Sequence, residues 1–315
     1  MCFIWRVSKR NFSVKAGVPQ GSVLSPLLYN LYVNDLSMVV PISLLQYAGD
    51  AVILSRASNY SDAFSSLQTA AIKTMDWFEA NLIKVNASKT QLICSHNLLK
   101  KVNMTCSLRL HTSRCLSCVC EPIEHISSIK YLGLFFDSDL TWNTHLAHVC
   151  NKIRAVSCLL YNTRYFMPLS VRKIVLHALV YSVLCYGITV YGHCALRWQI
   201  RINSILRSLL KNISYDLCLG KDIDAFKAPH LPDFNSLLME TVVHRHFWDS
   251  KFKVPHVPSR ILRPKERYRI PRCSTRFGKR ARSYYVPAFM NKLPSSILNL
   301  RTKYKLKKAL RNFRS

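Results

Sequence analysis

The segment between residues 43 and 55 limits the possible folds most strongly, because two short apolar runs flank a turn at Ala48-Gly49-Asp50. Such runs around a glycine-containing turn predict two antiparallel strands. Residues 61–82 then predict an amphipathic helix, since their apolar residues recur three and four positions apart. These residues are Phe64, Leu67, Ala71, Met75, Phe78 and Leu82. A strand pair followed by such a helix predicts an α+β fold.

Further elements are predicted on both sides of this hairpin. Gly17 and Gly21 punctuate a loop, and a helix is expected after it with Ser25 as its cap and Pro26 in its first turn. Other strands are expected at Thr90–Ser95 and between Ile123 and Asp137, and helices at 146–160, 171–191, 196–210 and 301–314. From Gly220 onward, repeated prolines favour loops and a linker.

Three further patterns restrict where the protein is expected to reside. Residues 174–191 are apolar enough for a membrane span, but His177 and Gly187 favour a buried helix instead. The N-terminus has no apolar run of signal-peptide length. The 12 cysteines lie in a chain of 315 residues, which is long for a disulfide scaffold. We therefore expect reduced thiols, no membrane segment and an intracellular protein, in the nucleus or the cytoplasm.

The charge is strongly one-sided, with 45 Lys and Arg against 16 Asp and Glu and a formal net charge of +29. Residues 251–315 hold 20 of these cations and a single acid, Glu266. A chain this basic indicates an anionic partner, nucleic acid first and an anionic membrane second. The alternative is a solvated basic surface without a specific partner.

Four blocks of sequence then occur in an order and spacing that matter together. They are Gly17-Val18-Pro19-Gln20-Gly21-Ser22-Val23-Leu24-Ser25-Pro26, Tyr47-Ala48-Gly49-Asp50, the 61–82 helix followed by Asn86-Ala87-Ser88-Lys89-Thr90, and Tyr131-Leu132-Gly133 with Asp139-Leu140-Thr141-Trp142. They resemble motifs B, C, D and E of the reverse transcriptases of LINE-type (non-LTR) retrotransposons, in particular the jockey-like group. The resemblance covers residues 17–195 and describes a C-terminal fragment from motif B onward.

This resemblance implies an architecture and a set of partners. It implies a partial polymerase palm over 1–143, a helical thumb or connection over 144–219, and a basic, proline-punctuated region over 220–315. The implied partners are an RNA template and a DNA primer, with Mg²⁺ as the cofactor. The basic helical face around Arg197, Arg201, Arg207 and Lys211 suits a nucleic-acid backbone. Aromatic residues between the cations would permit base stacking, and these are Tyr268, Phe277, Tyr284, Tyr285 and Phe289.

Motif C raises a question about activity. Nucleotidyl transfer uses two metal ions, and in the family one ligand comes from motif A and one from the first Asp of motif C. Gly49 stands at the second of these positions and has no ligand atom, which leaves Asp50 as the surviving acid and an incomplete metal site. Motif A should precede residue 17, yet the first carboxylate is Asp35. We therefore expect a chain that begins after motif A and is catalytically inactive.

The remaining site residues follow from the same resemblance. The template and nucleotide contacts of motif B map to Gly17, Pro19, Gln20, Gly21 and Ser22. Lys89 maps to a lysine proposed to protonate pyrophosphate, although an ordinary surface lysine is the alternative. Tyr131, Leu132 and Gly133 map to the primer grip, and a hairpin that simply packs on the palm is equally compatible.

A cluster of cysteines and histidines, with one Cys-x-x-Cys pair, allows a zinc site in principle, but no second well-spaced pair accompanies it and we do not expect one. Its members are Cys106, His111, Cys115, Cys118, Cys120 and His125. Three functional hypotheses remain open. The chain is an inactive RNA-directed DNA polymerase by descent, a non-enzymatic RNA- or DNA-binding protein, or a decayed relic without a function.

Overall fold

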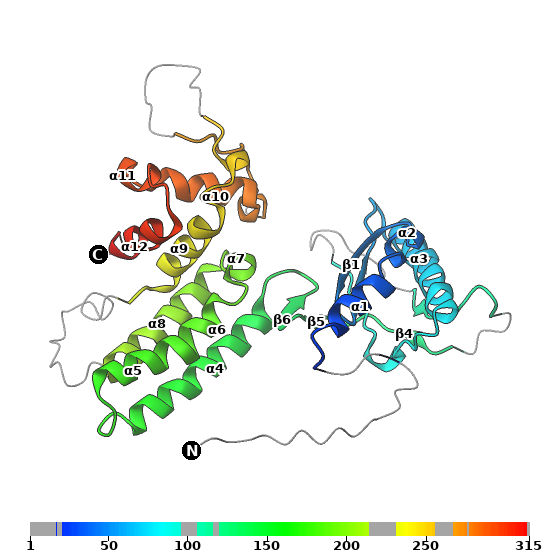
Figure 1. Cartoon of the computed structure of the whole chain (residues 1–315), viewed down its shortest axis with the longest axis horizontal. Helices are drawn as coiled ribbons and strands as arrows, with labels where there is room; N and C mark the ends of the chain where they lie inside the picture. Colours follow the sequence, from blue (N-terminus) through cyan, green and yellow to red (C-terminus); the bar gives the residue numbers. More distant parts are fainter. Residues whose placement is uncertain are drawn as a thin grey trace. The chain divides into compact units, whose positions relative to one another are not determined.

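The computed structural model describes residues 17, 21–95, 106–115, 120–213, 231–255, 267–275 and 277–313 (Figure 1). The chain divides into two compact units, Met1–Ile129 and Lys130–Ser315. Each unit is described by itself. The domain boundaries predicted at 143 and 219 follow from the family resemblance, whereas the two compact units reflect packing in space. These boundaries therefore stay a prediction.

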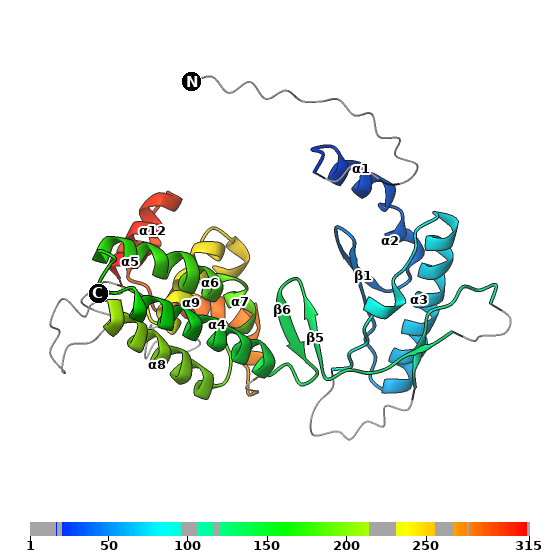
Figure 2. The ribbon, with the colours of Figure 1, turned by 90° about the horizontal axis from the view of Figure 1, so that it is seen from below.

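The first unit contains the predicted hairpin. Helices α1 (Ser25–Tyr32) and α2 (Leu36–Val39) precede strands β1 (Ser43–Tyr47) and β2 (Asp50–Leu54), and α3 (Tyr60–Ala80) follows them. The strands pair antiparallel, and Tyr47 faces Asp50 at the turn. Figure 2 shows α3 beside this hairpin. Their shared core consists of Val33, Leu36, Val40, Ala70 and Trp77.

Two details of this region differ from the sequence prediction. Ser25 is the first residue of α1 rather than its cap, because the helix begins one residue earlier than expected and Leu24 takes the cap position, while Pro26 lies in the first turn as predicted. Leu82 is 92% exposed, because α3 ends at Ala80 and Leu82 lies outside its apolar face.

The rest of the first unit is built from short elements. These are the 3₁₀ turn η1 (Ala87–Lys89) and the antiparallel pair β3 (Leu108–Arg109) and β4 (Pro122–Ile123). The predicted strand over 90–95 is wrong, since only Leu92 forms a bridge, with His125. A strand needs a partner along its length, and here Ile123, near His125, is paired with Leu108 instead.

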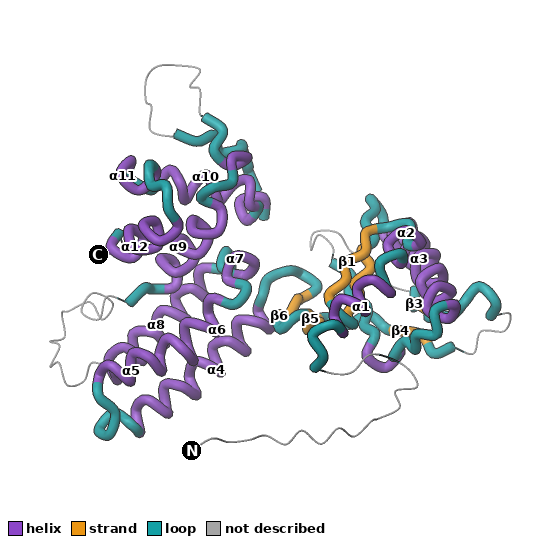
Figure 3. Tube along the Cα trace, in the orientation of Figure 1, coloured by secondary structure: helices purple, strands orange, loops and turns teal. Residues whose placement is uncertain are grey.

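The second unit starts with a hairpin and continues with helices. Strand β5 (Ser128–Tyr131), which begins two residues before the unit boundary, pairs with β6 (Leu134–Asp137). Helix α4 (Asn143–Asn162) follows, then α5 (Leu169–Leu176), the π-helix η2 (His177–Tyr181), α6 (Ser182–Cys185), α7 (Ile188–Tyr191) and α8 (Leu196–Ile213). Figure 3 shows α4, α5 and α8 side by side. The single helix predicted over 171–191 is therefore interrupted twice, at η2 and at Gly187.

The C-terminal residues complete the same core. They form α9 (Phe234–His246), the 3₁₀ turns η4 (Ser250–Phe252) and η5 (Gly278–Arg280), α10 (Arg282–Asn291), α11 (Ser295–Leu298) and α12 (Lys303–Asn312). One buried cluster runs from Leu134 to Leu310. The expectation of loops and a linker after Gly220 is thus wrong for these residues. Pro294 caps α11 and Pro232 lies just before α9, positions at which proline is compatible with a helix.

Among the described residues, no helix combines the length and apolarity needed to cross a bilayer.

Candidate functional site

The turn between β1 and β2 carries the motif C residues. Ala48 has a φ of +49°, a conformation that a non-glycine residue rarely adopts. Gly49 lies outside the left-handed region, and a Cβ built on it would meet no atom within 4 Å. Asp50 is exposed at the start of β2. The backbone of this turn therefore does not require glycine at position 49.

In the motif B loop, unlike the motif C turn, the backbone conformation favours glycine. Gly17 and Gly21 have φ values of +84° and +83°, and a Cβ on either would meet no atom within 4 Å, so backbone conformation favours glycine rather than lack of space. The hydroxyl of Ser22 accepts a hydrogen bond from the Leu24 amide at 3.3 Å, just before α1. Pro19 and Gln20 lie outside the described residues.

Lys89 ends the 3₁₀ turn η1 and is exposed. The turn is held by Asn86, whose side-chain oxygen accepts from the Lys89 amide at 3.3 Å and from the Ser88 hydroxyl at 2.6 Å. Within the described residues, no hydrogen bond or ion pair links Lys89 to Asp50. The structure thus fixes the backbone of Lys89 and leaves its role in chemistry as a prediction.

The donor set at this hairpin does not fit a pair of magnesium ions. Mg²⁺ is bound by oxygen ligands, commonly carboxylates, and a two-metal site needs several of them. The described residues include no group of three or more His, Cys, Asp or Glu side chains that could hold a metal ion. Asp35 is engaged elsewhere, since its carboxylate accepts from the Trp77 indole at 3.2 Å. We therefore derive no step through a metal for this chain.

The cysteine and histidine cluster has partners other than a metal where it is described. The Nε2 atom of His125 lies 2.7 Å from the Tyr60 hydroxyl and 3.2 Å from the Cys106 carbonyl oxygen. His111 lies 3.5 Å from the Gln68 side chain. Cys118 lies outside the described residues. The histidines thus stabilise the packing of α3 against the β3–β4 region.

In the second unit, the predicted primer-grip residues form the tip of the β5–β6 hairpin. Leu132 and Gly133 have φ values of +45° and +79°, the pattern of a tight two-residue turn. The Tyr186 hydroxyl donates to the Leu132 carbonyl. A Cβ on Gly133 would lie 3.2 Å from the Tyr186 ring. The tip is therefore fixed against the C-terminal end of α6, and Tyr131 beside it is half-buried.

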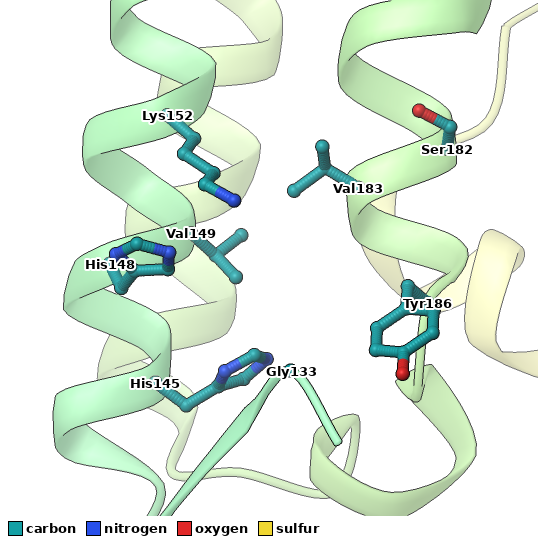
Figure 4. A pocket seen from close by; sticks show the side chains of 8 residues that line it. All are labelled: Gly133, His145, His148, Val149, Lys152, Ser182, Val183 and Tyr186. Atoms are coloured by element: carbon teal, nitrogen blue, oxygen red, sulfur yellow. The ribbon is translucent and has the colours of Figure 1, made fainter. Parts of the chain in front are cut away.

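A pocket of about 220 Å³ opens next to this tip (Figure 4). It is lined by Gly133 from the hairpin, by residues of α4 and by residues of α6. The lining side chains of the two helices are His145, His148, Val149, Lys152, Ser182, Val183 and Tyr186. Figure 4 shows Lys152 reaching from α4 toward Val183 on α6, and His145 at the end near Gly133.

The histidines of this pocket are held in their neutral form. His145 is 3% exposed, and neither of its ring nitrogens has a hydrogen-bond partner within the described part of the chain. Burial lowers its pKa to about 4, helped by the charges of His148 and Lys152 and opposed by Asp137. The pKa of His148 is also lowered, by burial and by Lys152 and Lys130. The charge of Lys152 thus acts on both histidines and disfavours their protonated forms.

The basic surface predicted on α8 is present. Arg197, Arg201, Arg207 and Lys211 are all exposed along that helix. The prediction of aromatic stacking residues is only partly met, because Tyr285 is 4% exposed and Phe289 packs beside His193 at 5.8 Å between rings. Both belong to the core of the unit, whereas Phe277 is 62% exposed.

Sequence reasoning missed His145, His148 and Lys152. Their spacing of three and four places them on one side of α4, a signal that was available. The apolar residues of the same helix, Leu146, Val149, Ile153 and Leu160, show the same spacing and dominated the interpretation. The partners on α6 lie about forty residues further along, which no local pattern reveals.

The fold defines a class of protein before any comparison. A strand hairpin with an acid at its turn, backed by helices, precedes a small hairpin and a helical unit with an exposed basic face. This α+β arrangement agrees with a partial polymerase palm followed by a helical thumb.

Comparison with known proteins gives the family. Residues 2–136 match the family model described as reverse transcriptase (RNA-dependent DNA polymerase). The chain is 27% identical over 212 residues to "RNA-directed DNA polymerase from mobile element jockey" of Drosophila melanogaster, covering 64% of this chain and 22% of that protein. It is 30% identical over 218 residues to "Probable RNA-directed DNA polymerase from transposon BS" of the same species, covering 62% and 22%.

A third relative is "Probable RNA-directed DNA polymerase from transposon X-element" of Drosophila melanogaster, 30% identical over 148 residues, covering 45% of this chain and 15% of that protein. Residues 2–136 are thus similar to reverse transcriptases, and the relatives are RNA-directed DNA polymerases of mobile elements, which agrees with the LINE-type resemblance of the four motifs. It spans about a fifth of the length of the curated relatives it matches. No solved structure matches the chain.

Proposed function

We propose that this chain is an RNA-directed DNA polymerase by descent that does not polymerise and that retains nucleic-acid binding. The observation that carries the first half is Gly49 at the turn between β1 and β2, where the family's motif C places a metal ligand. Asp50 beside it is exposed and belongs to no group of three or more described His, Cys, Asp or Glu side chains that could hold a metal ion.

The missing ligand matters because of the chemistry of the reaction. One metal activates the primer hydroxyl and one neutralises the leaving pyrophosphate, and together they contribute several kcal/mol to lowering the barrier. A glycine supplies no oxygen from its side chain, so the metal would lose a ligand at the point where the strands turn. The open space around Gly49 supports an origin by substitution rather than by a structural need.

The second half of the proposal rests on charge. The net charge is +29, and the cations of α8 and α12 are exposed. Lysine and arginine bind phosphates of either nucleic acid without reading the sequence. An RNA template and a DNA primer are the partners that the family implies.

A chimera tests the loss of activity. A preceding palm segment with its motif A acid, taken from a curated relative, is joined to this chain with Gly49 or with Gly49→Asp, and primer extension on an RNA template is measured. We expect extension at least about a hundredfold faster with Gly49→Asp. Equal extension by the Gly49 chimera would contradict the proposal.

A salt titration tests the binding. Binding of a labelled RNA–DNA primer–template is measured between about 50 and 300 mM salt beside a random single strand. A preference for the primer–template that survives added salt is expected. If added salt removes the binding of both ligands and neither is preferred, charge alone causes the binding, as expected for a decayed relic. A preference for one RNA without a primer would favour the non-enzymatic binding protein.

A further inference from the structure

We propose that the pocket between α4, α6 and the β5–β6 turn binds a phosphate group of a nucleic-acid strand, and that His145 takes up a proton when the phosphate binds. The inference rests on the proposed function, because it names one place where a bound strand would seat a backbone phosphate. Its chemistry is nevertheless that of any phosphodiester and is testable without a nucleic acid.

The first support is the charge around the pocket. Lys152 and His148 line it, and Lys130 lies near enough to lower the pKa of His148. Asp137 is the one carboxylate that acts on His145 in the opposite direction. Its Oδ2 atom already accepts from the Thr144 amide at 3.3 Å, at the N-terminal end of α4. Its Oδ1 atom is buried without a described partner, so an anion in the pocket would be attracted by Lys152 and opposed by Asp137.

The second support is the state of His145. Buried polar atoms nearly always have a hydrogen-bond partner, and each exception asks for an explanation. Within the described residues both ring nitrogens of His145 are exceptions, although its ring contacts Tyr191 at 4.7 Å between centroids. Protonated imidazole donates from both nitrogens, and phosphate oxygens only accept. A phosphate would therefore satisfy the His145 ring in its charged form.

The proton uptake follows from the same neighbours. His145 faces His148 and Lys152 from α4, Asp137 from β6, Tyr186 from α6 and Tyr191 from α7. Burial is the main cause that keeps it neutral above about pH 4, and the charge of Lys152 acts in the same direction. A bound phosphate adds a negative charge and favours the protonated ring, so the pKa of His145 rises on binding.

The third support is how the wall of the pocket is built. Ser182 and Val183 lie directly after the π-helix η2, an element that is frequent at functional sites, and Tyr186 follows α6. Val149 and Val183 face each other across the pocket and give it an apolar floor (Figure 4). A charge beside these apolar side chains loses part of its contact with water, whereas Lys152 at the rim stays exposed.

A small probe tests the pocket directly. Dimethyl phosphate keeps one negative charge across the titration range and is added to the full chain, with sodium chloride at equal ionic strength as the blank. The histidine ring signals are followed by NMR, and the His145 signal is assigned with the variant His145→Gln. We expect dimethyl phosphate to raise the midpoint of the His145 titration by about one pH unit. An unchanged midpoint, or an equal change with chloride, would overturn the proposal.

Variants of the rim test the same pocket with less risk to folding. Lys152→Gln removes the exposed cation, and Arg154→Gln is the matched control, because Arg154 lies on the same helix about 200° around its axis. Lys152→Gln should abolish the His145 response to dimethyl phosphate, and Arg154→Gln should leave it intact. The same response in both variants would contradict the proposal.

A nucleic acid links the pocket to the proposed function. For a primer–template, Lys152→Gln should weaken binding about tenfold and reduce the salt slope by about one, against about twofold for Arg154→Gln. If the wild-type chain binds no nucleic acid while dimethyl phosphate still moves the His145 midpoint, the proposed function fails and the phosphate pocket stands. Equal losses of affinity in the two variants would mean that no phosphate of the strand binds in this pocket, and would overturn that part of the proposal.

Discussion

Two glycines of this chain differ in whether their position requires glycine. Gly49 has open space at its Cα and an ordinary φ, whereas Gly187 has a φ of +69° and a Cβ there would lie 2.8 Å from a methyl group of Leu134. Gly187 follows Tyr186, the residue that holds the hairpin tip. Glycine is thus required at the α6–α7 junction and not at the motif C turn.

Gly49→Asp should leave stability nearly unchanged. The free energy of unfolding, measured by urea denaturation of the full chain, is expected to change by less than about 1 kcal/mol. Gly187→Ala is the contrasting variant and should cost about 1–3 kcal/mol, through its positive φ and the contact with Leu134. A large loss from Gly49→Asp would mean that the turn depends on glycine after all.

Two histidines with lowered pKa values, the buried His145 and the half-buried His193, should make stability depend on pH. Burial lowers the pKa of both His145 and His193 to about 4, below the ordinary value of 6.5. Between about pH 4 and 6.5 the unfolded chain binds protons that the folded chain does not, so stability should be complete above about pH 6.5 and decline toward pH 4. Urea denaturation at about pH 7.5 and pH 5 measures this decline. His145→Gln should reduce it, and the exposed His244→Gln should not.

At the scale of elements, one buried cation joins the ends of two helices. Arg172 is 2% exposed on α5. Its Nε donates to the Met167 carbonyl at 2.8 Å, and its Nη1 donates to the Ile213 carbonyl at the end of α8. The guanidinium therefore satisfies a carbonyl of the loop before α5 and a carbonyl that α8 leaves open at its C-terminal end.

Arg172→Met should destabilise the second unit by about 2–4 kcal/mol, because buried carbonyls lose a charged donor. Thermal unfolding of the full chain, followed by the helical signal, measures the loss. Arg154→Met removes an exposed arginine from the neighbouring α4 and should cost less than about 0.5 kcal/mol. Similar losses in the two variants would assign the effect to charge rather than to these hydrogen bonds.

The elements that sequence predicts well are those whose apolar spacing reports the final packing. Helices α3, α4, α8 and α12 follow from such spacing, and the β1–β2 hairpin from its turn. Helices α9 and α10 do not, because their apolar residues contact several partners and form no single stripe. Prolines before and within these helices also resemble loop signals when no neighbours are known.

The candidate site could be predicted from the sequence only where one short motif contains its residues. Asp50 and Gly49 were predicted from the motif C resemblance, and the hairpin at Leu132-Gly133 from the motif E resemblance. The contact between Gly133 and Tyr186 joins residues more than fifty positions apart, and no periodicity encodes it. The pocket beside it, where the ring nitrogens of His145 lack a described partner, becomes visible only when α4 and α6 are packed together.

For the whole molecule, the distribution of the core predicts how fragments behave. The buried cluster of the second unit extends from Leu134 to Leu310, so residues 130–315 hold one continuous core. In the first unit α1 leaves large apolar side chains exposed, among them Leu31 at 67%. The second unit also exposes apolar side chains, such as Phe166 at 87%, but its buried cluster is much the larger of the two units' cores.

Residues 130–315 expressed alone should melt cooperatively as a monomer, measured by calorimetry and light scattering. The full chain should associate more, and replacing Leu27 and Leu31 of α1 by lysine should reduce that association. Shortening the fragment to 130–213 removes α9 to α12 from the core and should abolish the cooperative transition. A cooperative melt of the shorter fragment would contradict a single core.

The π-helix η2 has a consequence for how this chain is compared with its relatives. A π-turn equals a regular helix with one residue inserted, so deleting one residue from His177–Tyr181 would restore ordinary helical winding. That deletion would turn everything downstream by about 100° and carry Tyr186 away from the Leu132 carbonyl. Relatives that lack the insertion would therefore need another anchor for the hairpin, and an aligned gap at 177–181 should coincide with a changed residue at position 186.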